Sequence, residues 1–182
     1  MSNAPAVWYL MRASGVVAQL LLTVAFALGV ATSKRWKPRA SRLWVTTAIH
    51  RNASLLAVVF LAIHVLTAAI DPDAAVRAVA VVWPLGTPWW LAVGTLSLDL
   101  VAALVVTSLG RRRLSFGAWR LIHWSAYAAW PLAIAHGLGM GTDVGAWWLQ
   151  GVTIACISAM GAVVTWRLLS PVAHGGLSAP SQ

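Results

Sequence analysis

The sequence predicts an all-α integral membrane protein, a bundle of five transmembrane helices. Of its 182 residues, 60% are hydrophobic and only 9% are charged, whereas about a quarter of the residues in a soluble domain are charged. Five apolar runs are each long enough to cross a hydrocarbon core of about 30 Å, which takes roughly 20 helical residues. Runs such as 16–30 lack the alternation of apolar and polar residues that marks a transmembrane β-strand.

In order along the chain, the five helices are expected at 13–32, 45–70, 89–109, 121–138 and 146–169. The first is too long for the apolar core of a cleaved signal peptide, so we expect it to remain in the mature protein. A short interfacial helix is expected at 74–82. In the fourth helix, Pro131 removes a backbone donor and crowds the preceding turn, which predicts several residues of tighter 3₁₀ winding there. The helices form one predicted domain, 1–170, followed by a flexible tail at 171–182.

The distribution of basic residues predicts how the bundle lies in the membrane. The net charge of +9 does not indicate a nucleic-acid-binding protein, because the bases lie between apolar runs instead of along one face. Cytoplasmic loops of membrane proteins carry an excess of Lys and Arg. We therefore expect the N-terminus outside and the C-terminus in the cytoplasm, in a multi-pass protein of a bacterial-type inner membrane with lipid as its surroundings. Eleven of the 13 bases fall on the predicted cytoplasmic side: Lys34, Arg35, Lys37, Arg39, Arg42, Arg51, Arg111, Arg112, Arg113, Arg120 and Arg167.

Four histidines lie inside predicted spans, where ionisable side chains are costly and usually functional. His50 and His64 are on the second helix, and His123 and His136 are on the fourth. Both helices run in the same direction, and the spacings of fourteen and thirteen residues correspond to rises of about 21 and 19.5 Å. His50 is therefore level with His123 near the inner surface, and His64 with His136 toward the outer one. Two such pairs fit two haems, each with an imidazole on both axial sides of the iron.

Binding a haem between two helices also requires that the histidines of each helix point toward the other helix. At about 100° per residue, fourteen steps return His64 to within about 40° of His50, but thirteen steps leave His136 about 140° from His123 in a straight helix. The tighter winding expected near Pro131 would recover much of this rotation. Hydrogen bonding between helices is the structural alternative for these histidines. Zinc fits less well, because two histidines at each level, with no Cys, Asp or Glu nearby, leave a tetrahedral site incomplete.

Two runs of the sequence resemble the ferric reductase-like transmembrane domain family. They are HRNASLLAVVFLAIH at 50–64 and RRRLSFGAWRLIHWSAYAAWPLAIAHG at 111–137, and the paired histidine spacings are the most specific feature. That family includes the membrane halves of ferric reductases and NADPH oxidases, and the haem subunit of the bacterial periplasmic methionine-sulfoxide reductase system. The resemblance implies two b-type haems, the inner one held by His50 and His123 and the outer one by His64 and His136.

The resemblance also implies partners for electron transfer. Relatives that work as single chains carry a flavin- and nucleotide-binding region after the last helix, whereas only about a dozen residues follow Ser170 here and no Gly-rich dinucleotide motif is present. We expect no flavin bound by this chain alone, and electrons from a cytoplasmic flavoprotein reductase or a membrane quinol. In oxidases that make superoxide, another His follows the outer ligand by one turn. Ala68 stands at that position, so oxygen reduction is not expected as the main task.

Other residues are candidates for supporting roles. Arg12 at the outer edge, and Arg51 and Arg120 beside the inner pair, are candidates for contacts to haem propionates. Arginines at such positions also extend to lipid headgroups, which is the structural alternative. Asp99 is the only carboxylate inside a predicted span, where a hydrogen bond that fixes helix packing is favoured over a proton relay. Four glycines are candidates for close approach of the backbone to a macrocycle: Gly15, Gly29, Gly137 and Gly139.

The sequence thus predicts an oxidoreductase, or the electron-transfer subunit of one, that passes electrons through two haems to an acceptor outside the cytoplasm. The acceptor is expected to be a ferric chelate, as in a ferric reductase. The alternative is a haem membrane subunit that feeds a separate periplasmic oxidoreductase as its partner protein. A non-redox transporter or scaffold is the alternative of another class, although transporters tend to have broken helices and internal repeats.

Overall fold

The computed structural model describes residues 4–33, 40–72, 74, 76–140 and 145–169. Within these ranges the chain is helical and contains no strand, so the all-α prediction is confirmed. The predicted tail at 171–182 lies outside the described residues, as do four of the predicted cytoplasmic bases: Lys34, Arg35, Lys37 and Arg39.

Four helices are long and apolar enough to cross a membrane. They are α1 (Ala4–Ser33), α2 (Ala40–Ile70), α3 (Trp89–Leu109) and α6 (Trp147–Leu169). α1 begins nine residues and α2 five residues earlier than expected. Pro5 lies in the first turn of α1, where a missing backbone donor costs nothing. The interfacial segment is shorter than expected and is a 3₁₀ turn, η1 (Ala78–Val81).

The fourth predicted helix is interrupted and does not form one continuous helix. Its residues form α4 (Phe116–His123) and α5 (Ala126–Met140), and a 3₁₀ turn, η2 (Arg111–Arg113), precedes them. The side chain of Ser115 caps α4 by accepting from the amide of Ala118. The two helices together cover 116–140, which is long enough to span the hydrocarbon core as one interrupted segment.

The tight winding lies before Pro131 rather than around it. Amide-to-carbonyl bonds three residues apart join Ser125 to Ile122, Tyr127 to Trp124 and Ala128 to Ser125, which is the 3₁₀ pattern. Pro131 lies inside α5, one and a half turns after this break. A proline acts on the turn that precedes it, because its ring crowds the carbonyl four residues earlier. The expected bend is therefore present, and its location is corrected to 122–128.

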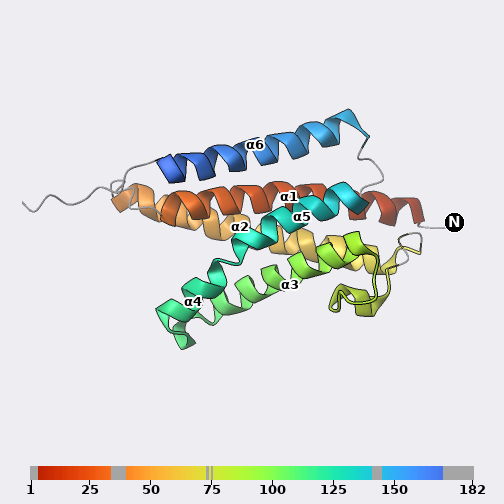
Figure 1. Ribbon diagram of the computed structural model, residues 1–182, viewed down its shortest axis with the longest axis horizontal. Coiled ribbons are helices and arrows are strands. Elements are labelled where there is room, and N and C mark those ends of the chain that lie inside the picture. Colours follow the sequence, from red (N-terminus) through yellow and green to blue (C-terminus); the bar gives the residue numbers. More distant parts are fainter. Residues whose placement is uncertain (1–3, 34–39, 73, 75, 141–144, 170–182) are drawn as a thin grey trace, which may run out of the picture.

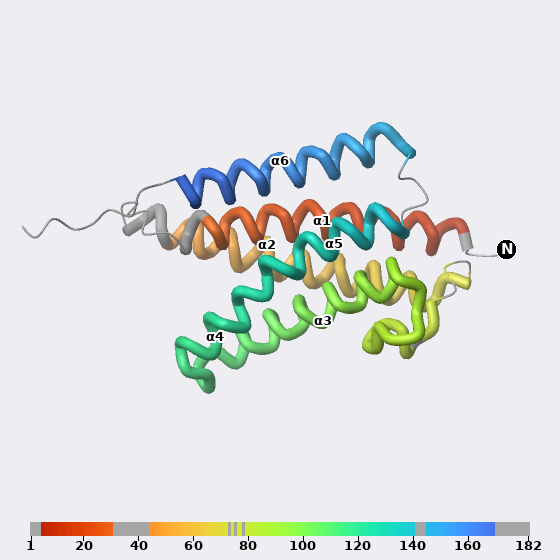
Figure 2. The backbone as a smooth tube through the Cα atoms, in the orientation of Figure 1, coloured from red at the N-terminus to blue at the C-terminus, as the bar shows by residue number. Residues whose placement is uncertain are grey.

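The helices associate as two pairs. α1 packs along the length of α2, and α3 packs along α5, whereas contacts between the two pairs are few. α6 lies against α1 on the side away from α3 (Figures 1 and 2). The N-terminus and the segment around η1 are at one end of the bundle, and α4 is at the other (Figure 1). The space between the pairs is where the histidines lie.

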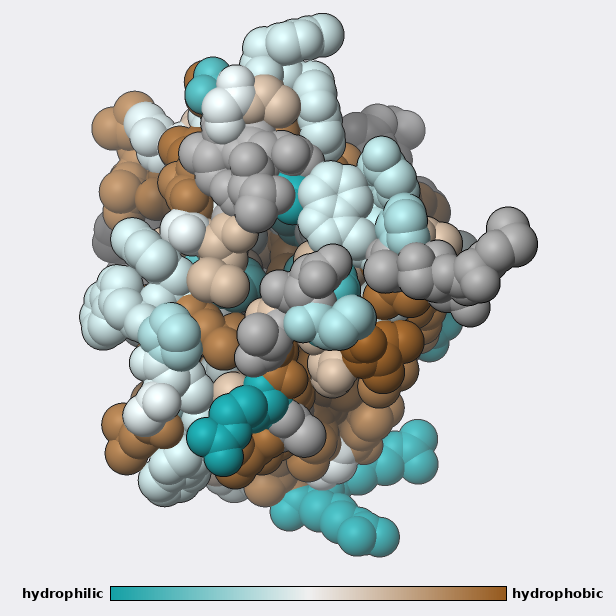
Figure 3. Space-filling model, turned by 90° about the vertical axis from the view of Figure 1, so that its right-hand side faces the viewer, coloured by the Kyte–Doolittle hydropathy of each residue, from teal (hydrophilic) through white to brown (hydrophobic). Residues whose placement is uncertain are grey.

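Small side chains dominate the buried surfaces between helices. Most of the buried residues are Ala, Ser or Thr, and Ala57, at 1% exposure, is among the most deeply buried of them. Small residues allow helix backbones to approach closely, as is typical of membrane bundles. Large apolar side chains such as Leu66, Leu109 and Trp147 are exposed. Seen from the end at which α1 begins, apolar side chains reach the surface between hydrophilic ones (Figure 3).

Candidate functional site

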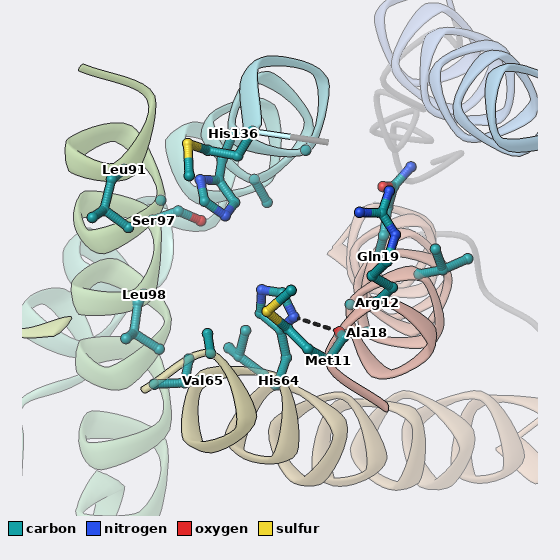
Figure 4. A pocket seen from close by; sticks show the side chains of 18 of the residues that line it. Met11, Arg12, Ala18, Gln19, His64, Val65, Leu91, Ser97, Leu98 and His136 are labelled. Atoms are coloured by element: carbon teal, nitrogen blue, oxygen red, sulfur yellow. Dashed lines mark hydrogen bonds between the residues drawn. The ribbon is translucent and has the colours of Figure 1, made fainter. Parts of the chain in front are cut away.

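His64 on α2 and His136 on α5 point toward each other across a cavity (Figure 4). Their ring centres are 6.4 Å apart, with an angle of 76° between the ring planes. The break between α4 and α5 and the 3₁₀ winding beside it turn α5 relative to α4, so His136 faces α2. The structure thus brings together the two histidines that the depth argument pairs at the outer level.

Three of the four histidines are oriented by the main chain of a neighbouring helix. The Nδ1 atoms of His50, His64 and His136 lie 2.8, 2.8 and 2.9 Å from the carbonyl oxygens of Ala25, Met11 and Trp90. A carbonyl oxygen only accepts, so each Nδ1 carries the proton and donates it. In this tautomer Nε2 keeps its lone pair and is the atom available to a metal.

Each of these carbonyls lies four residues before a glycine: Gly15, Gly29 or Gly94. In a helix the carbonyl of residue i points at residue i+4, so an imidazole that reaches this oxygen must pass over the side chain at i+4. A Cβ on Gly15 would lie 2.9 Å from Nδ1 of His64, and one on Gly94 would overlap the ring of His136. At Gly29 the closest approach, to Cε1 of His50, would be 3.3 Å. Glycine at these positions is what admits the rings.

The cavity between the two helix pairs has a volume of ≈ 510 Å³, within the range of about 300–1,000 Å³ that cofactor sites occupy. His64 and His136 both line it, together with apolar residues of α3 such as Leu91 and Leu98 (Figure 4). Its walls are mostly apolar, and Arg12 and Asp71 are the charged residues that line it. This composition suits a large planar apolar cofactor with a metal at its centre.

One side of the cavity, next to α6, is more polar. Arg12 and Gln19 line it from α1 (Figure 4). The guanidinium of Arg12 lies 4.6 Å from the ring centre of Trp8. The amide nitrogen of Gln19 donates to Oγ1 of Thr153 on α6 at 3.4 Å. Arg12 is thus the one predicted arginine that the structure brings to the cavity.

At the other level, His123 is held differently from the other three histidines. His50 and Arg111 both lie near enough to act on it electrostatically. The ring of His123 stacks on Trp119, with 4.7 Å between ring centres and 23° between planes. Its Nδ1 is buried without a hydrogen-bond partner, and so is Nε1 of Trp119. The guanidinium of Arg111 lies 4.5 Å from the ring centre of Trp119.

The donor set fits a haem better than a bare metal ion. Among the described residues, no group of three or more His, Cys, Asp or Glu side chains comes together, so neither level supplies the ligands of a zinc site. A porphyrin brings four nitrogens of its own and needs only two axial ligands. Two imidazoles on opposite sides of one metal, each bonded at about 2 Å, have ring centres about 6 Å apart. The separation of 6.4 Å between His64 and His136 fits this arrangement.

The other predicted site residues lie elsewhere. Arg51 and Arg120 are exposed, and the guanidinium of Arg120 lies over the ring of Phe116, 5.7 Å from its centre. Asp99 is partly buried on α3 and is not part of the cavity wall.

Gly94 lies against His136 and Trp119 stacks on His123, and neither was predicted as a site residue; nor was Arg111, which lies over Trp119. Arg111 belongs to a run of arginines after an apolar helix, and the positive-inside rule alone explains such a run. The role of Gly94 depends on which carbonyl His136 meets, and no sequence pattern reveals that contact.

Aromatic side chains occupy the region between the two histidine levels. Trp130 of α5 donates from Nε1 to the hydroxyl of Thr23 on α1 at 2.9 Å. Its ring centre lies 6.4 Å from that of Phe26, which in turn lies 4.9 Å from that of Tyr127. This cluster joins α1 to α5 at a depth between the two pairs.

Comparison with known proteins gives one match. A family model described as "Ferric reductase like transmembrane component" matches residues 14–134, which include His50, His64 and His123. No curated protein and no solved structure matches the chain.

Proposed function

The chain belongs to the ferric reductase-like transmembrane family, and from this premise we propose that it transfers electrons across a membrane through two b-type haems. The observation that carries the proposal is the pair formed by His64 and His136. Their rings face each other at 6.4 Å, and in both the proton is on Nδ1 and bonded to a main-chain carbonyl. Two Nε2 lone pairs are thereby directed into one cavity.

His64 and His136 would hold one haem, and His50 and His123 the other. Bound haem iron supplies one-electron chemistry, since it alternates between the ferric and ferrous states. The protein's own part is to fix the ligands. The bonds from Nδ1 to Met11, Ala25 and Trp90 lock the rings of three histidines, and such outer bonds also raise the basicity of the ligating nitrogen.

The depth of the two pairs supports transfer across the membrane. His50 and His64 are fourteen residues apart on α2, a rise of about 21 Å against a hydrocarbon core of about 30 Å. Two cofactors at these levels would divide the crossing into short steps. The cluster of Phe26, Tyr127 and Trp130 lies between the two levels.

We propose that the end with Arg111 faces the cytoplasm, in accordance with the positive-inside rule. The electron donor is then a cytoplasmic flavoprotein or a membrane quinol, and the acceptor lies outside. With both axial positions taken by histidine, an acceptor would take its electron at the edge of the outer haem and not at the iron. Arg12, which lines that cavity, supplies positive charge suited to an anionic ferric chelate.

Reconstitution into sealed vesicles tests the function. Vesicles that enclose a membrane-impermeant ferric chelate are given an impermeant reductant outside, and reduction of the trapped iron is followed. We expect vesicles with the wild-type protein to reduce it at a rate proportional to their protein content. Vesicles with His64→Ala should reduce it no faster than vesicles without protein.

Equal rates in wild-type and protein-free vesicles would contradict electron transfer to this acceptor. A parallel experiment on the purified, chemically reduced protein distinguishes the two kinds of acceptor. Rapid reoxidation by ferric chelates supports a ferric reductase. A protein that stays reduced until a soluble partner is added supports the haem subunit of a separate oxidoreductase.

A further inference from the structure

We infer that Trp119 and Arg111 bind a propionate carboxylate of the haem held by His50 and His123. This inference rests on the proposed function and assigns to that haem two residues that neither the sequence pattern nor the family match identifies. It replaces the sequence-based expectation that Arg51 and Arg120 have this role.

The indole N–H of Trp119 is the first observation. Its Nε1 atom is buried and has no hydrogen-bond partner, although a buried donor without a partner is destabilising and tryptophan N–H groups are normally satisfied. The ring itself is held, because it stacks on His123 at 4.7 Å between centres. A fixed, buried and unsatisfied donor beside a haem ligand indicates an acceptor that belongs to the cofactor.

The position of Arg111 is the second observation. Its guanidinium lies 4.5 Å from the ring centre of Trp119, and it is one of the charges that act on His123. Arg120 instead lies over Phe116. The N–H of Trp119 and the cation of Arg111 therefore lie together on the same side of His123.

A carboxylate is the group that this combination recognises. Guanidinium and N–H donors form charge-assisted hydrogen bonds with carboxylate oxygens, and a haem carries two propionates. Trp119 precedes His123 by one turn, about 6 Å closer to the end of the bundle. A carboxylate avoids the hydrocarbon core and favours this polar end, so the haem would be oriented with its propionates toward η2.

The experiment removes the donor and keeps the ring. Trp119→Phe preserves stacking on His123 but lacks the N–H, and its matched control is Trp44→Phe, since Trp44 is 75% exposed. Arg111→Gln removes the cation, and its control is Arg112→Gln in the same 3₁₀ turn. Both side chains are exposed, and of the two it is the guanidinium of Arg111 that lies over the ring of Trp119. Each protein is purified with its haems and titrated redox-potentiometrically, and resonance Raman spectra record the propionate-bending bands.

Loss of a propionate partner leaves the negative charge of the carboxylate less compensated near the iron, which favours the ferric form. We expect Trp119→Phe and Arg111→Gln each to shift the ferric/ferrous ratio of the inner haem about threefold toward ferric, about 30 mV for a one-electron couple. One propionate-bending band should move, and the two controls should match the wild type. His123→Ala identifies the inner haem, because it removes that component from the titration.

Two results would overturn the inference. In the first, the wild type holds two haems but Trp119→Phe and Arg111→Gln leave the potential and the bending bands unchanged. In the second, the shift appears only in anionic lipid and vanishes in neutral detergent, which would assign the two residues to a lipid phosphate. A wild-type protein without haem would instead contradict the proposed function itself.

Discussion

His50, His64 and His136 meet their neighbouring helices in the same way, at a carbonyl four residues before a glycine. The arrangement solves two problems at each position. The carbonyl fixes the tautomer and the ring direction, and the glycine leaves room for the ring to reach that carbonyl. His123 lacks such a carbonyl and is held by the face of Trp119 instead.

Gly94→Ala is expected to remove the outer haem. The new Cβ would overlap the imidazole of His136. The ring would then lose its hydrogen bond to the carbonyl of Trp90 and no longer point into the cavity. Haem content should fall from about two to about one per chain, as measured by a pyridine haemochrome assay with protein quantitation. Gly151→Ala, where a Cβ meets open space, is the control. Two haems in both variants would show that the glycine is dispensable.

Depth along the helices could be predicted from the sequence, because it depends only on residue spacing. The pairing of His64 with His136 follows from it, and the structure brings these residues together. The contacts of Gly94 and Trp119 could not be predicted in this way. They depend on how helices cross and rotate, which a single sequence does not encode locally.

At the scale of elements, the interruption between α4 and α5 is the feature that lets His123 and His136 both face α2. A continuous helix would leave His123 and His136 about 140° apart. Each residue in a 3₁₀ turn adds about 20° of rotation over an α-helical one, and the interval between 122 and 128 contains several such turns. Pro131 predicts that the segment bends. It does not predict at which residue of the preceding turn the bend lies.

Pro131→Ala is expected to disturb the alignment of the two ligands on the fourth segment. Alanine restores the backbone donor and relieves crowding, so the α-helix can extend toward His123 and remove rotation. At least one haem should lose an axial histidine and convert partly from low spin to high spin, which electron paramagnetic resonance detects. Pro5→Ala, in the first turn of α1, should leave both haems low spin. Fully low-spin haems in Pro131→Ala would mean that the break is maintained by other contacts.

For the whole molecule, the two helix pairs touch each other little and enclose a cavity of ≈ 510 Å³. A haem in this space would contact both pairs and supply much of the apolar core between them. The prediction that five apolar runs form a membrane bundle needed only composition and length, and four of the helices are long and apolar enough to span a membrane. The division into two pairs around a cavity was not predictable, because every helix is apolar over most of its surface and no face is marked for a partner.

Protein produced under haem limitation is therefore expected to be less stable than the haem-loaded form. A ligand at about 100 times its Kd stabilises a protein by about 2.7 kcal/mol. For a chain of this size, losing that stabilisation lowers Tm by roughly 5–10 °C. Thermal unfolding in detergent, followed by a dye or by light scattering, measures the difference. Adding haem to the limited protein should restore Tm, and equal Tm values without haem would contradict a core completed by the cofactor.

The stoichiometry of haem in the wild type and in two histidine variants tests most directly whether this bundle holds two haems between four histidines. A pyridine haemochrome assay with protein quantitation is applied to the wild type, His64→Ala and His123→Ala. We expect about two b-type haems per chain in the wild type and about one in each variant, with different absorption bands lost in the two variants. A wild type without haem, or variants that keep both haems, would contradict the ligand assignment.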